Sequence, residues 1–167
     1  MSPHMSHINH QRIPEVEEVL ALDILTLREH TELAGDTFDA EVQRTVLTNS
    51  LKISEIISVR RDGVLVAYAM LRPQPEARGC WFVTGFNSHP KHRNAATFRY
   101  LFAQIFLVTQ RRSITSLRSN VYKTNRLSMA FHKRLGFTIT RENAKGIEFC
   151  ATVKELMTSP FIAALRI

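Results

Sequence analysis

The residues with the clearest chemical potential lie in a basic turn between an apolar run and an amphipathic segment. The run Cys80–Phe86 is rich in aromatic and β-branched residues, the turn His89–Arg93 follows it, and Asn94 is a good N-cap for a helix. The first N–H groups of a helix have no partner within it, and the helix dipole is positive there. The turn is therefore predicted to bind a phosphate, most simply the pyrophosphate of a cofactor.

A second group of polar residues shares one face of a later predicted helix. Asn125, Ser128 and His132 lie at i, i+3 and i+7, so their side chains form one stripe. A polar stripe beside an apolar one is typical of a helix that lines a cleft, and a solvated face is the alternative. The apolar stripe, which we expect to face the core, consists of Leu127, Phe131 and Leu135.

The elements that must position these two groups follow from periodicity, caps and turns. Asp62-Gly63 between two apolar runs predicts a β-hairpin, and Gly136 predicts the end of the second helix described above. Val42, Val46 and Leu47 are expected to point inward from an early helix. In chain order we expect helices at 14–33 and 39–51, strands at 56–61, 64–71 and 80–86, a helix from 94 to about 110, a strand at 114–121, a helix at 125–135, and strands at 137–140 and 147–153. Residues 157–167 are ambiguous.

This order of elements predicts a mixed α/β (α+β) sheet covered by helices in three layers. We expect residues 13–167 to form a single domain, which is long enough for a sizeable core. Residues 1–12 are polar and are predicted to be a flexible N-terminus. Their histidines, His4, His7 and His10, leave metal binding as an alternative.

Composition bounds the class of protein and its partners. Of 167 residues, 44% are hydrophobic and 22% charged, as in soluble globular proteins, and no apolar run is long enough to cross a bilayer. The N-terminus lacks the apolar core of a signal peptide, so we expect a cytoplasmic location. Cys80 and Cys150 lie in apolar runs and are predicted to be buried thiols without metal-ligand spacing. The net charge of +7 favours an anionic partner, which could be a cofactor phosphate, an acidic substrate or nucleic acid.

The sequence resembles the GNAT acyltransferase superfamily over roughly residues 53–153. The most specific part is the pattern N-x-x-S-x-x-F-H-x-x-L-G-F at Asn125–Phe137, where the family usually carries Tyr in place of His132. The turn is similar to the family's pyrophosphate loop, Arg/Gln-x-x-Gly-x-Gly/Ala. Here Ala96 and Phe98 replace the two glycines, so the Phe98 ring would either point into the core or crowd the cofactor.

The resemblance implies a mostly antiparallel central sheet of six to seven strands, with helices on both faces and a V-shaped splay between the two central strands. It also implies acetyl-CoA as co-substrate and no metal. The implied cofactor-binding residues are Phe86, Asn87 and Ser88 for the pantetheine arm, Arg93, Asn94, Ala95, Ala96, Thr97 and Phe98 for the pyrophosphate, and Asn125 and Ser128 on the later helix.

The implied reaction moves an acetyl group to a primary amine. His132 is the expected acid for the leaving thiolate, with Tyr122 as the second candidate. The general base stays open, because the strand 80–88 has no carboxylate where many relatives carry a Glu. The candidates for that role are His89, Glu29, Glu32, His30 and a water molecule.

The acceptor is not encoded in any motif. It could be a small molecule, a protein or an aminoacyl-tRNA, and a homodimer is possible, whereas a membrane partner is not expected. The alternative is a catalytically degenerate binding or regulatory module on the same fold. A pure nucleic-acid binder is a third class, which would bind with a steep dependence on salt.

Overall fold

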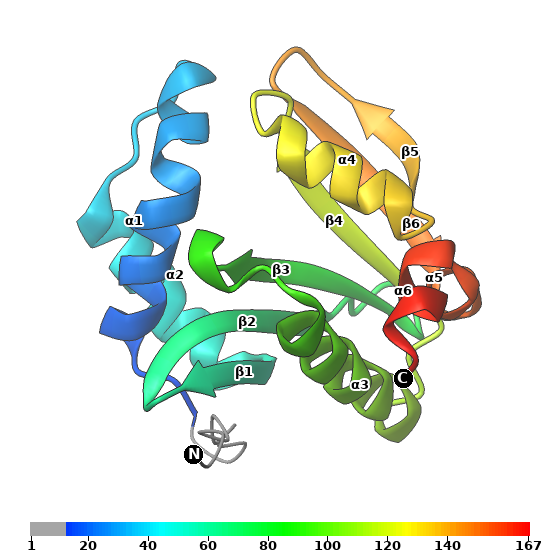
Figure 1. Cartoon of the computed structure of the whole chain (residues 1–167). Coiled ribbons are helices and arrows are strands. Elements are labelled where there is room, and N and C mark those ends of the chain that lie inside the picture. The colour runs from blue at the N-terminus through cyan, green and yellow to red at the C-terminus, as the bar shows by residue number, and fades with distance from the viewer. Residues whose placement is uncertain (1–12) are drawn as a thin grey trace.

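The structure is a computed structural model and describes residues 13–167, so the predicted flexible stretch 1–12 lies outside the described residues. Every predicted element is present, and the ambiguous C-terminal segment is helical (Figure 1). In chain order the elements are α1 (Val16–Leu33), α2 (Ala40–Ile53), β1 (Glu55–Arg61), β2 (Val64–Pro73), β3 (Cys80–Ser88), the 3-10 turn η1 (Pro90–His92), α3 (Ala95–Arg111), β4 (Ser116–Tyr122), α4 (Arg126–Arg134), β5 (Thr138–Glu142), β6 (Gly146–Thr152), α5 (Val153–Thr158) and α6 (Pro160–Leu165).

The six strands form one sheet in the order β1-β2-β3-β4-β6-β5. All neighbours are antiparallel except β3 and β4, which confirms the mostly antiparallel sheet. The β1–β2 turn confirms the Asp-Gly prediction, since Asp62 and Gly63 have φ of 50° and 79°. Two successive positive φ angles are what a tight type I′ hairpin requires.

The two central strands part after a short paired segment. β3 and β4 are paired only from Cys80 to Val83 and from Ser116 to Ser119. Thr84 lies at a β-bulge, because the register between β2 and β3 shifts at this point, and a bulge increases local twist. The V-shaped splay implied by the family resemblance is thus confirmed, and the outer half of β3 keeps β2 as its strand partner.

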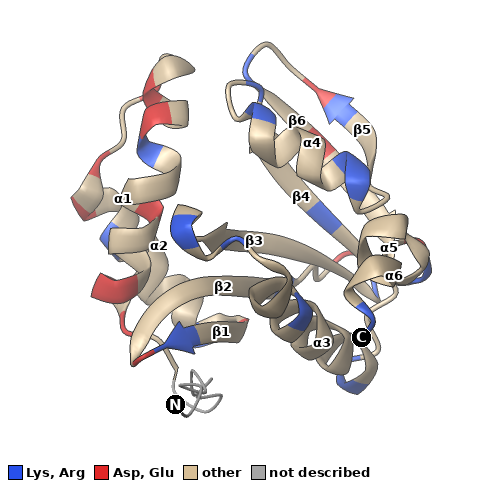
Figure 2. Cartoon of the chain, viewed as in Figure 1, with Lys and Arg blue, Asp and Glu red and all other residues tan. Residues whose placement is uncertain are grey.

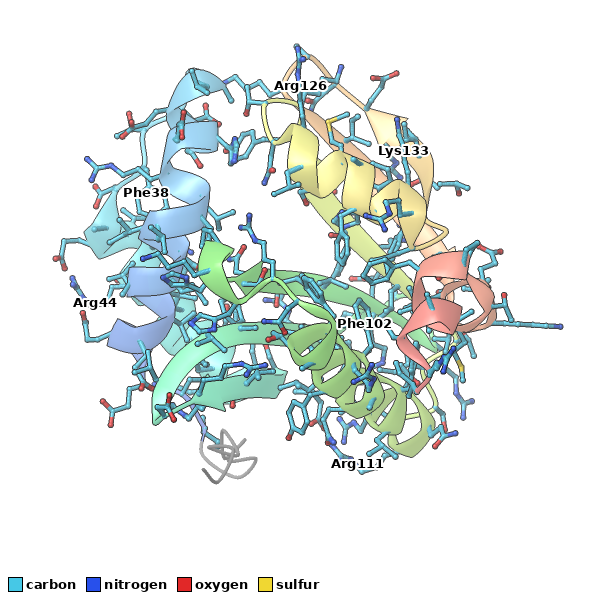
Figure 3. All side chains as sticks on the ribbon, viewed as in Figure 1. Phe38, Arg44, Phe102, Arg111, Arg126 and Lys133 are labelled. Atoms are coloured by element: carbon cyan, nitrogen blue, oxygen red, sulfur yellow. The ribbon has the colours of Figure 1, made fainter. Side chains whose placement is uncertain are left out.

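Helices cover both faces of the sheet. α1 and α2 pack on one face over a core that includes Leu20, Leu47 and Tyr68, and α3 packs on the other face (Figure 1). Figure 3 shows Phe102 of α3 directed into the interior, whereas Lys133 of α4 points outward. No helix within residues 13–167 is both long enough and apolar enough to cross a membrane.

The predicted inward face of α2 is wrong at two positions. Leu47 is buried, but Val42 and Val46 are 60% and 48% exposed. The helix is rotated because Gln43, four residues before Leu47, donates a 2.9 Å hydrogen bond to Asp23 of α1 and therefore shares the packed face. Of the two cysteines, Cys80 is buried as predicted, whereas Cys150 is only partly buried, and both are free thiols.

Candidate functional site

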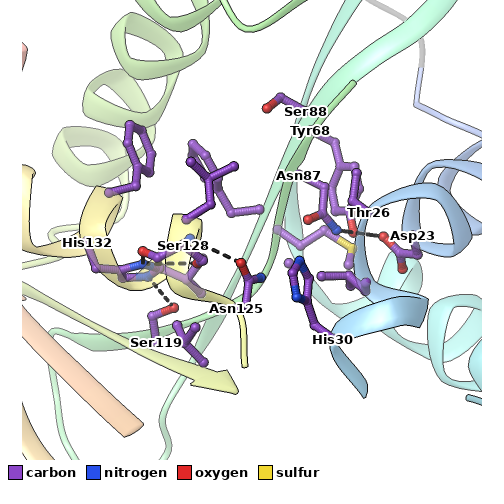
Figure 4. Close-up of a pocket in the computed structure, with 18 of the residues that line it drawn as sticks. Asp23, Thr26, His30, Tyr68, Asn87, Ser88, Ser119, Asn125, Ser128 and His132 are labelled. Carbon is purple, nitrogen blue, oxygen red and sulfur yellow. Dashed lines mark hydrogen bonds between the residues drawn. The ribbon is translucent and has the colours of Figure 1, made fainter. Parts of the chain in front are cut away.

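A cleft of about 800 Å³ opens where β3 and β4 part. α1 and α2 form one wall, α4 forms the other, and the outer half of β3 and the start of α3 lie between them (Figure 4). All the residues predicted to bind the cofactor or to act as the acid line this cleft except Ala96 and Thr97, and of the base candidates Glu29 and His30 line it whereas Glu32 and His89 do not. Residues that are far apart in the chain are therefore brought together as the motifs predicted.

The turn before α3 leaves only some of its amides open. Asn94 caps α3, since its Oδ1 accepts a 3.0 Å hydrogen bond from the Thr97 amide, and its carbonyl oxygen accepts one of 3.1 Å from the Phe98 amide. Thr97 itself is fully buried. The amides at the exposed start of the helix, those of Ala95 and Ala96, are therefore the ones that an anion could bind.

Two guanidinium groups add positive charge at this turn. Arg93 donates from Nε to Ser88 Oγ at 3.1 Å and from Nη2 to the Ser88 carbonyl oxygen at 3.2 Å. Burial lowers the pKa of Arg93, but a guanidinium remains protonated at neutral pH. Arg61, at the end of β1, reaches Asn94 Oδ1 with Nη2 at 3.4 Å. Sequence reasoning missed Arg61, because only the position of the hairpin beside α3 brings it here.

The Phe98 ring points into the core, which was one of the two predicted possibilities. Its centroid lies 5.5 Å from that of Phe131 on α4 and 6.0 Å from that of Phe161 on α6. Phe98 and Phe161 both line the cleft as well. The side chain that replaces a glycine of the family pattern therefore forms part of the cleft wall and leaves the amides of Ala95 and Ala96 accessible.

The polar stripe of α4 is turned further toward the sheet than predicted. His132 is buried and stacks on Phe149 of β6 at 4.9 Å, whereas Leu127, predicted to face the core, is 60% exposed. Asn125 Oδ1 caps the helix by accepting a 3.1 Å hydrogen bond from the Ser128 amide. The prediction for Leu127 is thus wrong, because the hydrogen bonds of His132 orient that side of the helix toward β4.

His132 has two hydrogen-bond partners that define its tautomer. Nδ1 lies 2.7 Å from the Ser128 carbonyl oxygen, which can only accept, so Nδ1 carries the proton. Nε2 lies 2.9 Å from Ser119 Oγ, and in the neutral ring it accepts the hydroxyl proton of Ser119. Burial lowers the pKa of His132, which favours this neutral form.

One end of the cleft is bridged by hydrogen bonds from β4, the loop before α4 and the β5–β6 turn to the C-terminal end of α1 and the loop after it. Tyr122 donates a 2.7 Å hydrogen bond to Asp36, which also binds Lys145. The bond to Asp36 raises the pKa of Tyr122, whereas the contact with Lys145 lowers the pKa of Asp36. Thr124 donates a 2.6 Å bond to the His30 carbonyl oxygen, which ties α1 to the loop before α4.

A buried carboxylate on the α1 wall was missed by sequence reasoning. Asp23 is 1% exposed, and its oxygens accept hydrogen bonds from Tyr68, Asn87 and Gln43 (Figure 4). Burial raises the pKa of Asp23, and burial also raises the pKa of Tyr68 well above its usual value. The signal in the sequence was a charged residue within the apolar face of the first helix, four residues before Leu27.

Charge is distributed unevenly around the cleft. Figure 2 shows acidic residues on α1 and basic residues on the turn after β3 and on α4. Within residues 13–167, no group of three or more His, Cys, Asp or Glu side chains is arranged to hold a metal ion. The cleft thus has guanidinium groups at its end beside α3 and a carboxylate, that of Asp23, on the opposite wall.

The two parted parallel strands and the helix start at the mouth of the gap are features that the resemblance to the GNAT superfamily implied. A family model described as the acetyltransferase (GNAT) family matches residues 22–137, and the chain belongs to this family. Members of the family use acetyl-CoA, which was the predicted co-substrate. No curated protein sequence matches the chain.

Solved structures share the fold at low sequence identity. The PaiA N-acetyltransferase from Thermoplasma acidophilum, in complex with coenzyme A, is 11% identical with a TM-score of 0.66, over 91% of this chain and 99% of that one. The ribosomal-protein-S18-alanine N-acetyltransferase from Escherichia coli is 13% identical with a TM-score of 0.64, over 89% and 94%. A putative acetyltransferase from Salmonella typhimurium, with acetyl-CoA, is 15% identical with a TM-score of 0.57, over 89% and 95%.

Proposed function

We propose that this protein is an N-acyltransferase that moves the acetyl group of acetyl-CoA to a primary amine. The observation that carries the proposal is the cleft between the parted strands, which joins a cationic helix start to a wall containing a buried carboxylate. This arrangement provides separate places for an anionic carrier and a cationic acceptor. Neighbours of the same fold whose names call them N-acetyltransferases support nitrogen as the acceptor atom.

The residues at the α3 end fit the phosphates of the co-substrate. The amides of Ala95 and Ala96 would bind the pyrophosphate, and Arg93 and Arg61 would add charge-assisted hydrogen bonds. The edge of β3 at Phe86–Ser88, which β4 leaves unpaired, would hold the pantetheine arm. When bound, acetyl-CoA supplies the activated thioester, and the protein supplies position and electrostatic stabilisation.

We assign protonation of the leaving thiolate to His132, with Tyr122 as the second donor. Both residues line the cleft. His132 can donate from Nε2 only as an imidazolium, and Ser119 Oγ would be the first atom to receive that proton. Tyr122 instead has its hydroxyl engaged by Asp36.

The acceptor belongs to one of three classes: a small amine, a protein amine or an aminoacyl-tRNA. The net charge of +7 supports tRNA only weakly, because basic residues are spread along the chain. A homodimer also stays a prediction. Binding of tRNA that weakens steeply between low and physiological salt would favour the nucleic-acid acceptor.

The second candidate function is a degenerate module that binds but does not catalyse. It is favoured by Ala96 and Phe98 in place of glycines and by the lack of a carboxylate on β3. Thermal unfolding with acetyl-CoA, followed by detection of free thiol in the presence of primary amines, separates the two. A raised midpoint with amine-dependent thiol release supports the enzyme, whereas a raised midpoint without release supports the module. No shift at millimolar acetyl-CoA would overturn the enzyme and support the module.

A further inference from the structure

We propose that Asp23 is the general base, which takes a proton from the acceptor's ammonium group, and that the acceptor is a primary amine on an apolar body. This inference rests on the proposed acyltransferase function. It concerns the one role that the sequence motifs left open.

Asp23 places a carboxylate beside the strand that lacks one. β3 carries Asn87 on its outer half, beyond the point where β4 departs. Asn87 Nδ2 donates a 2.8 Å hydrogen bond to Asp23 Oδ1, so α1 delivers the carboxylate to the edge of the splay. Asp23 and Asn87 both line the cleft, on the wall opposite α4 (Figure 4).

Asp23 lines the cleft although it is only 1% exposed, and its hydrogen bonds within the described residues do not use all the lone pairs of Oδ2. Oδ1 accepts from Tyr68 and from Asn87, whereas Oδ2 accepts from Gln43 alone among the described residues, at 2.9 Å. A carboxylate oxygen has about two lone pairs, so Oδ2 can accept one further N–H. The three donors fix the carboxylate in place, which is what proton transfer at a defined position requires.

Burial of Asp23 makes proton uptake by its carboxylate more favourable. Removal from water raises the pKa of Asp23, although its three hydrogen bonds oppose the shift. A carboxyl group whose pKa is raised toward neutrality is a better base than an exposed one. Tyr68 is the titratable side chain packed directly against Asp23, and His30, Glu29, His132 and Arg93 face the same cleft.

The ammonium R–NH3+ gives one proton to the Asp23 carboxylate and becomes the free amine R–NH2. Its lone pair forms a C–N bond to the acetyl carbonyl carbon, the C–S bond breaks, and the sulfur leaves as a thiolate. The thiolate gains the second proton of the amine through an acid in the cleft, which leaves an amide and a free thiol. Asp23 then releases its proton to water.

The walls around Asp23 define the rest of the acceptor. Leu25, Val46 and Leu127 line the cleft and are 55%, 48% and 60% exposed, so they present apolar surface at its open side. A polyamine would place its further charges against these side chains. An amine with an apolar body would instead bury that surface, which is favourable by the hydrophobic effect.

The first test uses acetyl-CoA and 2-phenylethylamine with the full-length protein and the variant Asp23→Asn. Asn has nearly the same shape as Asp. Its Nδ2 can donate to Oε1 of Gln43 if the Gln43 carboxamide rotates by about 180°. We expect Asp23→Asn to lower kcat/KM by about a hundredfold or more. Its affinity for coenzyme A should stay within twofold, and its thermal midpoint should not fall.

The pH profile separates a base from a residue that only holds α1 in place. In the wild type, kcat/KM should fall as Asp23 becomes protonated at low pH. In Asp23→Asn it should rise about tenfold per pH unit up to the pKa of the amine, because only free amine from solution can then react. Glu41→Gln, which changes an exposed carboxylate of α2 outside the cleft, should retain the wild-type profile.

A second variant keeps the test valid if Asp23→Asn does not fold. Tyr68→Phe removes one donor from Asp23 and should move the acidic limb of the profile to higher pH while the plateau is retained. Profiles of Asp23→Asn or Tyr68→Phe that run parallel to the wild type would overturn the role of Asp23. Turnover with spermidine but not with 2-phenylethylamine would overturn the apolar acceptor, whereas absence of coenzyme A binding in the wild type would overturn the proposed function itself.

Discussion

Ser119 of β4 is the last residue paired with β3, opposite Val83, and its hydroxyl lies 2.9 Å from Nε2 of His132. The point where the sheet opens is thus also the point where α4 is attached to it. A change at either residue acts both on the cleft and on the histidine that is proposed to act there.

Replacement of His132 by Phe tests its assignment as the acid. We expect turnover with acetyl-CoA to fall by about a hundredfold, while coenzyme A affinity changes much less, because proton donation acts only in the transition state. Steady-state kinetics and calorimetry measure the two quantities. Ser119→Ala is the matched control, since it removes the hydrogen bond to Nε2 and keeps the imidazole. Unchanged turnover in His132→Phe would remove this residue from the mechanism.

His132 should also make stability depend on pH. Burial lowers its pKa in the folded state below the unfolded value of about 6.5, so the unfolded chain binds more protons between these two values. The free energy of unfolding should therefore decrease as the pH falls below about 6.5. Urea denaturation at pH 5 to 8 measures this free energy, which should depend less steeply on pH in His132→Phe than in the wild type. An identical pH dependence of the free energy of unfolding in both proteins would contradict the lowered pKa of His132.

Gly85 is expected to be essential for packing rather than for backbone freedom. A Cβ at this position would lie 2.7 Å from Tyr68 Cε2 and 2.8 Å from Met70 Cε, and both side chains are buried. Gly85→Ala should destabilise the protein by about 1–3 kcal/mol through overpacking. It should also lower activity, because Tyr68 holds Asp23. Met70→Ala removes one of the two clashes, so chemical denaturation should show a smaller loss from Gly85→Ala in a Met70→Ala background than in the wild type.

Arg93 is expected to contribute to cofactor affinity. Removing a guanidinium that can bind a phosphate should weaken coenzyme A binding by roughly tenfold to a hundredfold. Arg111→Ala is the control, since Arg111 lies at the far end of α3 and pairs with Glu55. Calorimetry with coenzyme A measures both variants, and equal affinities for Arg93→Ala and wild type would show that the phosphates bind elsewhere.

Tyr122 has two possible effects that one pair of variants separates. Tyr122→Phe and Asp36→Asn both weaken the bridge at the end of the cleft, but only the first removes a hydroxyl that could donate to the thiolate. If Tyr122 is the acid, kcat should fall about a hundredfold in Tyr122→Phe alone. Similar kcat values with a raised KM for the amine in both variants would show that Tyr122 only shapes the acceptor end.

Local signals predicted most of the fold. Asp62-Gly63 gave the hairpin, Asn94 and Asn125 gave the caps of α3 and α4, and Gly136, with φ of 90°, ends α4. Such signals act within a few residues, so a sequence carries them without tertiary information. The pattern at Asn125–Phe137 added the family and, with it, the splay.

Local sequence signals could not predict how each helix is rotated about its own axis. Periodicity identifies stripes on a helix, but it does not say which of two adjacent stripes meets the sheet. α4 packs His132 rather than Leu127, and α2 packs Gln43 beside Leu47, because polar partners on β4 and α1 are there to receive them. Those partners come from long-range packing.

Asp23 was missed for the same reason. It meets Asn87, which lies 64 residues further along the chain, and Tyr68, which lies 45 residues further. A single Asp in an apolar helix face can equally be a satisfied core residue or a functional one. Its donors and its position beside the splay distinguish the two, and both depend on the assembled sheet.

Because β3 and β4 pair over only a short segment, an extended ligand in the gap could form hydrogen bonds with both strands, as an added strand would. Past Val83 and Ser119, each strand offers one edge of main-chain groups to whatever enters. A bound pantetheine arm would connect β3 and β4 across this gap. Deuterium uptake at Phe86–Ser88 and at Asn120–Tyr122 should therefore slow together when coenzyme A is added, so the molecule would be stiffest when it is loaded.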